Sequence, residues 1–282
     1  MIKAYSQSAF SKNNQGGNLA GIVFDEFNLS KEEKLKISRY LGYSETVFVS
    51  SSKKADYKFK YYTPEAEVPM CGHATIAAFS LMHKLNMLKF SSCNIETGSG
   101  ILNISIFPDG LIYMQQNRPQ YGEILKPDLF ENCIDIYLID NTKPIQIVST
   151  GLRDIILPIK NLDSLNNMTI NFNEMINITK KYNTVGIHAF TLLDDKEKVA
   201  ICRNFAPLYG INEESATGTA NCALACYLHR IGIKKKEYIF EQGYNLKSVS
   251  EITVKLDYTL DEINFVQVGG YGYTVNSVDI AL

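Results

Sequence analysis

Cys71, Gly72 and His73 follow one another in the stretch VPMCGHATIAAF, immediately before a run of small apolar residues. A thiol at the start of a helix can ionise below its usual pKa and act as a nucleophile or a base. A positioned imidazole moves protons near neutral pH. Both residues also have a structural interpretation, because free cysteine is a common small core residue and histidine often only makes a supporting hydrogen bond. The stretch therefore predicts a nucleophile, a base, or the entrance to a buried helix.

Glu45 is a second candidate for proton chemistry, in the stretch GYSETVFVS just before an apolar strand pattern. A glutamate at the start of a strand is usually an exposed carboxylate. The other interpretation is a general acid or base placed at a binding cleft. The residues around Glu45 do not decide between the two.

Other chemistry-bearing patterns are weaker. Cys71 and His73 would need further ligands to hold a metal, and no CxxC or HxxxH pattern supplies them, so no metal site is predicted. Gly98-Ser99-Gly100 is typical of a turn and lacks the strand-to-helix context of a dinucleotide site, so no cofactor is predicted. Gly269-Gly270 is predicted to be another turn.

The chain contains an internal repeat that bears on how these residues are positioned. The segment GHATIAAFSLMHKLNM from Gly72 matches GTANCALACYLHRIGI from Gly218. YTP at Tyr62–Pro64 matches FAP at Phe205–Pro207, and IETG matches FEQG further on, all at a nearly constant offset. We infer two related halves, each a β-rich lobe with one principal helix.

The two principal helices, predicted over Ala74–Leu85 and Ala220–Ile231, carry apolar or small residues almost all round. A helix that is apolar on every face is buried, so each is expected inside its own curled sheet. Asn86 and Gly232 fit left-handed positions just after the helix ends. The N-termini offer free N–H groups and a positive dipole end, which predicts a small carboxylate ligand held between the lobes.

The second copy of the repeat also tests the thiol. Cofactor-independent amino-acid racemases use two opposed cysteines, one in each lobe. The residue before Gly218 is Thr217, with no cysteine near it, and Glu213 and Glu214 stand there instead. The two-thiol interpretation therefore lacks its second thiol, and Cys71 is expected to be a bystander.

Composition excludes several function classes. The 282 residues carry 28 Lys and Arg against 30 Asp and Glu, a net charge of −2, so no basic field serves nucleic acid or a membrane surface. No apolar run approaches the roughly 18 residues of a spanning helix, and MIKAYSQSAF at the N-terminus lacks the apolar segment of a signal peptide. The six cysteines form no regular framework, so free thiols in the cytoplasm are predicted.

Several motifs resemble those of a known family. SETVFV, EAEVPMCGHATIAAF, NFAPLYGINEESATGTANCALACYL, EQG and, near the start, GGNLAGIVF are similar to segments of the phenazine-biosynthesis F-like (PhzF-like) isomerases. They occur in the family's order over nearly the whole chain. This family has the diaminopimelate-epimerase-like fold.

The resemblance implies an α+β fold of two pseudo-symmetric lobes, each a mixed β-barrel-like sheet wrapped around a central buried helix. We place the N-terminal lobe at residues 1–118, completed by a strand at 274–282, and the C-terminal lobe at residues 119–273. The resemblance also implies a cofactor-independent isomerase that moves a proton on a small carboxylic acid, working as a homodimer.

The resemblance further implies roles for individual residues. The family's catalytic glutamate corresponds to Glu45, its histidine to His73, and its acidic residue in the second half to Glu214. Backbone groups at both helix ends are implied to hold the substrate. The predicted substrate-binding set is Asn18, Cys71, Gly72, Thr217, Gly218 and Thr219.

The chain departs from the family pattern at some of these positions. Glu214 stands where the family has Asp, Thr219 where it has Ser, and LKSVSEI replaces an Arg-Pro-Ser segment after QG. The first two changes keep the functional group, although the glutamate reaches about 1.5 Å further, one C–C bond. These changes bear on substrate identity more than on reaction type.

Three hypotheses follow. In the first, Glu45 takes a proton from carbon and returns it at another position. His73, Glu214 and Thr219 then orient the substrate and share protons, while N–H groups at the helix ends stabilise the developing charge. In the second, the protein is an amino-acid racemase or epimerase that works through Cys71 with Glu214 or Glu45. In the third, it is a catalytically idle protein that still binds a small acid.

Overall fold

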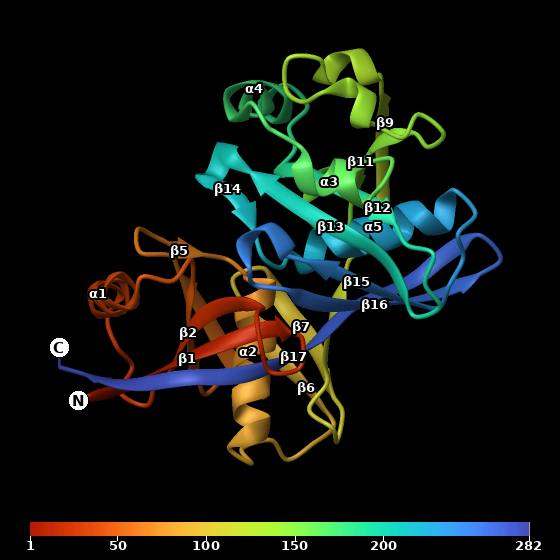
Figure 1. Ribbon diagram of the computed structural model, residues 1–282. Helices are drawn as coiled ribbons and strands as arrows, with labels where there is room; N and C mark the ends of the chain where they lie inside the picture. Colours follow the sequence, from red (N-terminus) through yellow and green to blue (C-terminus); the bar gives the residue numbers. More distant parts are fainter. Residues whose placement is uncertain (282) are drawn as a thin grey trace. The chain divides into compact units, whose positions relative to one another are not determined.

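Residues 1–281 are described by the computed structural model, and they divide into two units. The first unit comprises Met1–Gln115 and Gly269–Leu282, and the second comprises Gln116–Val268. In each unit, strands surround one long helix (Figure 1). The predicted α+β class, with two related halves built around buried helices, is confirmed.

The first unit is organised around helix α2 (Gly72–Lys84). A second helix, α1 (Lys31–Leu41), connects two neighbouring parallel strands. The strands are β1 (Ile2–Ser11), β2 (Asn18–Phe24), β3 (Thr46–Ser50), β4 (Tyr57–Tyr62), β5 (Glu67–Val68), β6 (Ser92–Thr97), β7 (Gly100–Ile106), β8 (Ile112–Gln116) and the later part of β17 (Glu262–Ile280). β17 runs antiparallel to β1, with Ile280 opposite Ile2, so the two ends of the chain lie side by side (Figure 1).

The second unit repeats this plan around helix α5 (Gly218–Arg230). Its strands are β9 (Gln120–Leu125), β10 (Ile145–Ser149), β11 (Arg153–Pro158), β12 (Gly186–Leu192), β13 (Lys198–Ala206), β14 (Ile211–Glu214), β15 (Glu237–Gln242) and β16 (Ser250–Thr259). Helices α3 (Leu162–Asn167) and α4 (Phe172–Lys181) stand in chain order where α1 stands in the first unit. Short 3-10 helices are η1 (Pro127–Phe130), η2 (Ile136–Leu138), η3 (Pro207–Tyr209) and η4 (Tyr244–Leu246).

The strand pairings follow the same order in both units, as the sequence repeat predicts. β2 and β3 pair in parallel, as β11 and β12 do. β4 pairs antiparallel with β3 and β5, as β13 does with β12 and β14. α2 then connects β4 to the parallel strand β6, and α5 connects β13 to the parallel strand β15. Each long helix is therefore the crossover that two parallel strands require.

Helices α2 and α5 are buried along nearly their whole length. α2 packs against β1, β2 and β3, and α5 packs against β10, β11, β12 and β16. Apolar side chains on every face of these helices meet a strand. Burial therefore stabilises each helix on all its sides, whereas an amphipathic helix is buried along one stripe only.

The ends of the two helices follow the prediction at one end only. Asn86 and Gly232 have φ angles of +55° and +96°, which confirms the left-handed positions after the helices. Both helices begin two residues earlier than predicted, at Gly72 and Gly218, because the apolar pattern starts only in the middle of the first turn.

The first turns of α2 and α5 also differ from those of the other α-helices. Among the described residues, α1, α3 and α4 each begin after a side chain that accepts a hydrogen bond from the first turn. No side chain within residues 1–281 caps α2 or α5 in this way. Their first N–H groups therefore remain available to a ligand.

The predicted turn at Gly269-Gly270 is wrong, because both residues lie inside strand β17. A Cβ atom at Gly269 would lie 2.5 Å from the ring of Tyr113. Close approach of a neighbouring side chain, rather than a turn, requires glycine at this position. Gly98-Ser99-Gly100, in contrast, joins β6 to β7 in a hairpin, as predicted.

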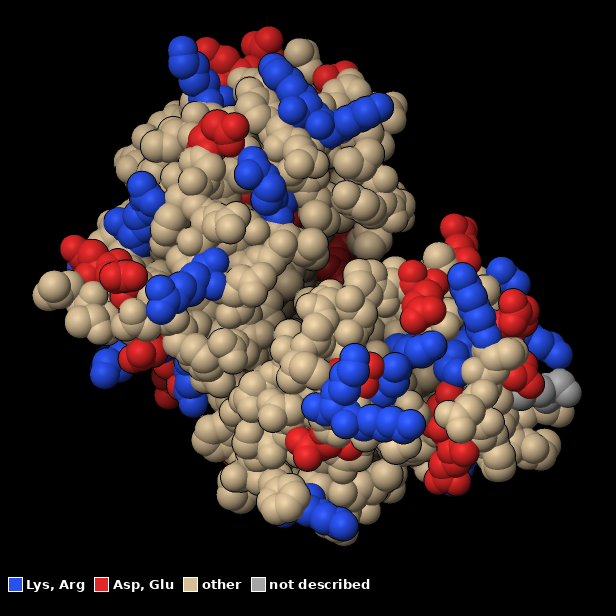
Figure 2. All heavy atoms as spheres, turned by 180° about the vertical axis from the view of Figure 1, so that it is seen from behind, with Lys and Arg blue, Asp and Glu red and all other residues tan. Residues whose placement is uncertain are grey.

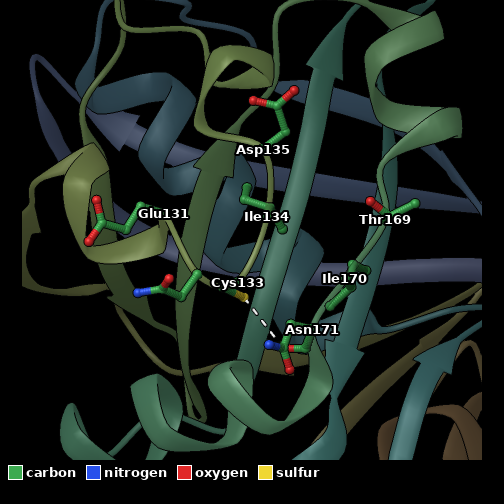
Figure 3. A pocket seen from close by; sticks show the side chains of 8 residues that line it. Glu131, Cys133, Ile134, Asp135, Thr169, Ile170 and Asn171 are labelled. Atoms are coloured by element: carbon green, nitrogen blue, oxygen red, sulfur yellow. Dashed lines mark hydrogen bonds between the residues drawn. The ribbon is translucent and has the colours of Figure 1, made fainter.

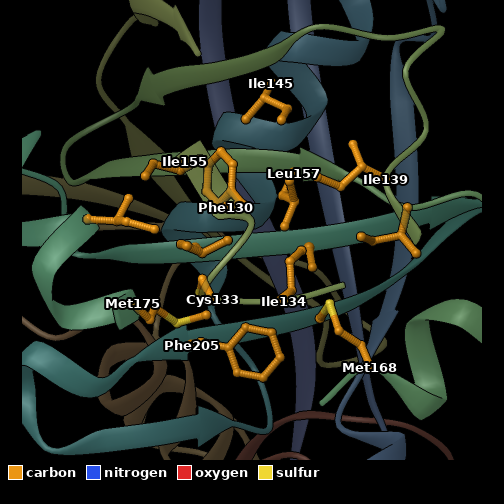
Figure 4. Close-up of a cluster of buried hydrophobic side chains, with 14 of the residues drawn as sticks. Phe130, Cys133, Ile134, Ile139, Ile145, Ile155, Leu157, Met168, Met175 and Phe205 are labelled. Carbon is orange, nitrogen blue, oxygen red and sulfur yellow. The ribbon is translucent and has the colours of Figure 1, made fainter. Parts of the chain in front are cut away.

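An apolar cluster packs on the outer face of the sheet in the second unit (Figure 4). Ile155 on β11 belongs to this cluster with Leu165 of α3 and Met175 of α4. Side chains alternate along a strand, so Asp154 on β11 faces the opposite side, toward α5. The same alternation places His188 on the α5 side of β12, since its neighbour Ile187 belongs to the outer cluster.

The surface carries charges of both signs. Figure 2 shows Lys and Arg side chains interspersed with Asp and Glu side chains over the visible face, in agreement with a net charge of −2. Of the helices within residues 1–281, none has the length and apolar character that crossing a membrane takes.

Phe79 on α2 tests whether the helix is enclosed. Its side chain is fully buried and stacks on Phe59, with ring centroids 5.5 Å apart. We expect Phe79→Ala to lower the free energy of unfolding by about 3–5 kcal/mol, because it opens a cavity between helix and sheet. Urea denaturation measures this change. Phe90→Ala is the matched control, since Phe90 is 68% exposed and its truncation should cost less than about 1 kcal/mol. Equal losses in the two variants would contradict the enclosed position.

Candidate active site

The N-terminus of α2 brings two of the predicted catalytic residues together. His73 is the second residue of the helix, and Glu45 immediately precedes β3. The N–H of Gly21 donates to the Glu45 carbonyl at 3.0 Å, which fixes the Glu45 backbone beside β2. Nε2 of His73 and Oε2 of Glu45 lie 3.3 Å apart. Packing of the helix end against this part of the sheet therefore creates an imidazole–carboxylate pair.

This pair is largely withdrawn from water. The side chain of His73 is 8% exposed and that of Glu45 is 20% exposed. The Oε2 atom of Glu45 is buried, and its contact with His73 lacks the alignment of a hydrogen bond; no other residue within 1–281 donates to it. An oxygen in this state can accept a hydrogen bond or a proton from a ligand.

Two further side chains touch the imidazole. Sγ of Cys71 lies 3.4 Å from Nδ1 of His73, and Oγ of Ser44 lies 3.5 Å from Nε2. Cys71, His73 and Glu45 thus bring three atoms of metal-binding type within 4.8 Å of one another. A thiolate, an imidazole and a carboxylate could hold Zn²⁺ with water as the fourth ligand. The same residues also form a proton-transfer site, in which the Glu45 carboxylate is the proton acceptor and Cys71 and His73 are the two neighbouring titratable groups.

The remaining predicted residues of the first unit lie on the elements around this pair. Gly72 opens α2, and a Cβ atom there would lie 3.2 Å from Cε of Met114 on β8. Its N–H belongs to the uncapped first turn, which attracts anions through the helix dipole. Asn18 is half-buried and opens β2, opposite Ala9 of β1.

The second unit gathers its predicted residues at the start of α5. Glu214 ends β14, Thr217 precedes the helix, and Gly218 and Thr219 begin it. Oγ1 of Thr217 donates to Oε2 of Glu214 at 2.5 Å. Oγ1 of Thr150 donates to the carbonyl of Thr219 at 3.3 Å, which ties the loop between β10 and β11 to the first turn. A carboxylate thus stands beside the second uncapped helix end.

The neighbouring Glu213 has a different environment. Nε and Nη2 of Arg203 donate to its two carboxylate oxygens at 3.0 Å and 2.8 Å. A two-pronged ion pair of this kind fixes both side chains. Glu213 is therefore held by Arg203 and is not a candidate for ligand binding.

Sequence reasoning missed two titratable residues on the inner face of the second unit's sheet. Asp154 is 2% exposed, and burial, followed by the negative charge of Glu214, raises its pKa to about 7. His188 is fully buried, which lowers its pKa to about 4, and its Nδ1 lies 3.0 Å from Oδ1 of Asn204. A signal for Asp154 was present in the sequence, since this charged residue opens the otherwise apolar stretch DIILP.

A surface hollow of about 370 Å³ lies elsewhere in the second unit (Figure 3). The segments 131–135 and 169–171 line it. Its cysteine, Cys133, lies 3.9 Å from the carbonyl of Asn171, and burial raises the pKa of its thiol to about 11. A thiol that stays protonated at neutral pH is a poor nucleophile, so this hollow is not the candidate active site.

Comparison with known proteins adds evidence on the family and the fold that is independent of the site geometry. A family model described as phenazine biosynthesis-like protein (PhzC-PhzF) matches residues 7–277. The uncharacterized isomerase CA_C3446 of Clostridium acetobutylicum is 32% identical, and the match covers 99% of this chain and 97% of that protein. The Bacillus anthracis phenazine biosynthesis protein of the PhzF family aligns with a TM-score of 0.91 and 29% identity, covering 100% of this chain and 99% of that one. A hydroxyproline epimerase of Agrobacterium vitis, 10% identical, shares the fold with a TM-score of 0.62 over 98% of this chain and 91% of its own.

Asp154 should make the stability of the protein depend on pH. Its carboxyl keeps its proton up to about pH 7 in the folded chain, whereas an unfolded chain loses it at about pH 3.9. The folded state therefore binds more protons between these values, and its stability falls as the pH rises through this window. We expect Asp154→Asn, which cannot ionise, to exceed the parent in stability by about 2–4 kcal/mol at pH 8 and by little at pH 4.5.

Urea denaturation at the two pH values measures this difference. Asp257→Asn is the control, because Asp257 is exposed on β16. It should leave the pH dependence of stability as in the parent. If Asp154→Asn differs from the parent by the same amount at both pH values, the buried carboxyl does not cause the effect.

Proposed function

The chain belongs to the phenazine biosynthesis-like protein family, and we propose that it is an isomerase that moves a proton on a small carboxylic acid without a cofactor. Glu45 transfers the proton, and His73 orients the substrate beside it. The observation that carries the proposal is the 3.3 Å contact between His73 and a buried oxygen of Glu45 at the uncapped start of α2.

The proposed reaction uses Glu45 twice. Its carboxylate accepts a proton from carbon, the C–H bond breaks, and the electron pair moves into the conjugated system of the acid to give an enolate-like anion. The neutral Glu45 then returns the proton to a different carbon, so the side chain ends in its starting state. First-turn N–H groups at Gly72 and Gly218 bind the carboxylate or stabilise the developing charge.

The other predicted residues take supporting roles in this proposal. Glu214 and Thr219 orient the substrate and share protons, and Asn18, Cys71 and Thr217 belong to the binding set. The 2.5 Å hydrogen bond between Thr217 and Glu214 supports a joint role for these two. A homodimeric state and a cytoplasmic location stay predictions.

One observation favours a second candidate, an amino-acid racemase or epimerase. Cys71 precedes α2, and its Sγ lies 3.4 Å from Nδ1 of His73, an arrangement in which the imidazole can take the thiol proton. The thiolate would then remove the proton from carbon in place of Glu45. The repeat has Thr217, not a cysteine, at the position equivalent to Cys71, so a carboxylate such as Glu214 would have to serve as the opposing acid.

Proton exchange with solvent tests the proposed function. The protein is incubated in D₂O with a panel of small carboxylic acids, and NMR detects deuterium uptake at carbon. We expect uptake at one carbon of at least one acid, and a loss of about 10²–10⁴-fold in Glu45→Gln, because the amide cannot accept the proton. Retained exchange in Glu45→Gln would contradict the role of Glu45. Binding of an acid without exchange would instead favour a catalytically idle binding protein.

Cys71→Ala separates the two candidate reactions. If Cys71 only borders the site, the variant should keep its exchange rate within about tenfold of the parent, since it loses one contact to His73 but no proton acceptor. Kinetic measurement on the acid found above decides the question. Loss of exchange comparable to that of Glu45→Gln would show that the thiol is the base.

A further inference from the structure

Gln242 is the last residue of β15 and is fully buried beside the start of α5. Its Nε2 donates to the carbonyl of Glu214 at 2.7 Å and to Oγ1 of Thr217 at 3.1 Å. Its Oε1 accepts from the N–H of Thr217 at 3.2 Å and from Nδ2 of Asn221 at 2.9 Å. These four hydrogen bonds use the full capacity of a side-chain amide, which holds the neighbouring groups in one arrangement.

The direction of the hydrogen bonds follows from groups that can play only one role. Nδ2 of Asn221 also donates to the carbonyl of Thr217 at 2.9 Å, and a carbonyl can only accept, so this atom of Asn221 is the nitrogen. Gln242 must then face Asn221 with its oxygen. Its nitrogen consequently faces the Glu214 carbonyl and the Thr217 hydroxyl.

The donor and acceptor roles of the Thr217 hydroxyl are therefore fixed as well. It accepts from Gln242, and its single proton points to Oε2 of Glu214, 2.5 Å away. A bond this short is typical of an ionised acceptor. The hydrogen bonds from Gln242 through Thr217 thus present Glu214 as a carboxylate.

A purely structural role for this arrangement would be to cap α5. A threonine before a helix usually accepts a hydrogen bond from the first turn, but Thr217 gives its proton to Glu214 and makes no such cap.

By the sequence repeat, Thr97 corresponds to Gln242 in the first unit, and its hydroxyl donates to the carbonyl of Gly100 in the hairpin. The enclosed helix of the first unit thus forms without a glutamine at this position.

We propose that Gln242 is a positioning residue for the reaction, which acts through Thr217 to hold Glu214 ionised and aim it as a hydrogen-bond acceptor for the substrate. The substrate then carries an N–H or O–H donor, such as an ammonium or hydroxyl group, in addition to its carboxylate. This inference rests on the proposed isomerase function and narrows its substrate class.

Substitutions along this path test the inference. Gln242→Met removes the amide donors at similar length, and Thr217→Val removes the hydroxyl. We expect each to lower kcat/KM by about 10–100-fold, as loss of a hydrogen bond to a charged group does. The double variant should lose about as much as the worse single variant, because the two residues act as a unit. Thr217→Ser keeps a hydroxyl and should lose far less than Thr217→Val.

Gln146→Met is the matched control. Gln146 is another glutamine of the second unit, 4% exposed, and its Nε2 donates to the carbonyl of Gly122 at 3.2 Å. Its replacement can lower stability but should leave kcat/KM unchanged. Additive losses in the Gln242→Met, Thr217→Val double variant would overturn the proposal, as would an equal loss of kcat/KM in Gln146→Met.

A second measurement separates this inference from the proposed function, because it needs no turnover. ¹³C NMR follows the ionisation of the Glu214 carboxyl in the parent and in Gln242→Met. We expect Glu214 to ionise at higher pH in the variant, since a hydrogen-bond donor to its charged form is no longer held in place. An unchanged ionisation would overturn the inference even in an active enzyme. If the ionisation moves but no acid exchanges its proton, Gln242 still holds Glu214 ionised through Thr217, and the isomerase proposal fails.

Discussion

Both halves of the chain depend on enclosing a helix that has no polar face. α2 and α5 carry small and apolar residues all round, and burial of this surface supports the fold only if strands cover each side of the helix. The pairing order of the strands meets this requirement in the same way twice, with each helix as the crossover between two parallel strands. The order of the strands around each helix follows from that requirement.

Enclosure also determines where polar chemistry can occur. The titratable groups that face the side of α5, Asp154 and His188, are buried. The candidate ligand-binding groups stand instead at the two N-termini, where no described side chain caps the first-turn N–H groups. The two ends have then diverged. The end of α2 has an imidazole beside a carboxylate oxygen that receives no hydrogen bond from the described residues. The end of α5 has a carboxylate held by a directed set of hydrogen bonds.

The sequence was sufficient for features that depend on local pattern or on the repeat. Asn86 and Gly232 follow from helix-end chemistry, and the enclosed helices follow from apolar residues on every face. It was not sufficient for features that depend on packing between distant segments. Gly269 looked like a turn because its neighbour, the Tyr113 ring, is distant in the chain. Asp154 was not singled out from the sequence, because its burial depends on the packing of α5 against the sheet.

The candidate site likewise has features that the sequence indicated and features that only the packing of distant segments shows. The helix end at His73 could be inferred from the residues, but the role of Glu45 came from family resemblance, since a glutamate before a strand is usually exposed. Its contact with His73 exists only because β3 and the start of α2 pack together. The part played by Gln242 required the individual hydrogen bonds, because nothing in EQG alone indicates where a glutamine side chain points.

The central claim is that one carboxyl, that of Glu45, both removes and returns the proton. The most direct measurement uses an acid that the protein isomerises, deuterated at the carbon that loses its proton. Mass spectrometry then analyses the product of a single turnover in ordinary water. The account predicts that a measurable fraction of the deuterium reappears at the new carbon, because the same carboxyl holds it between the two steps. A product entirely free of deuterium would contradict this mechanism.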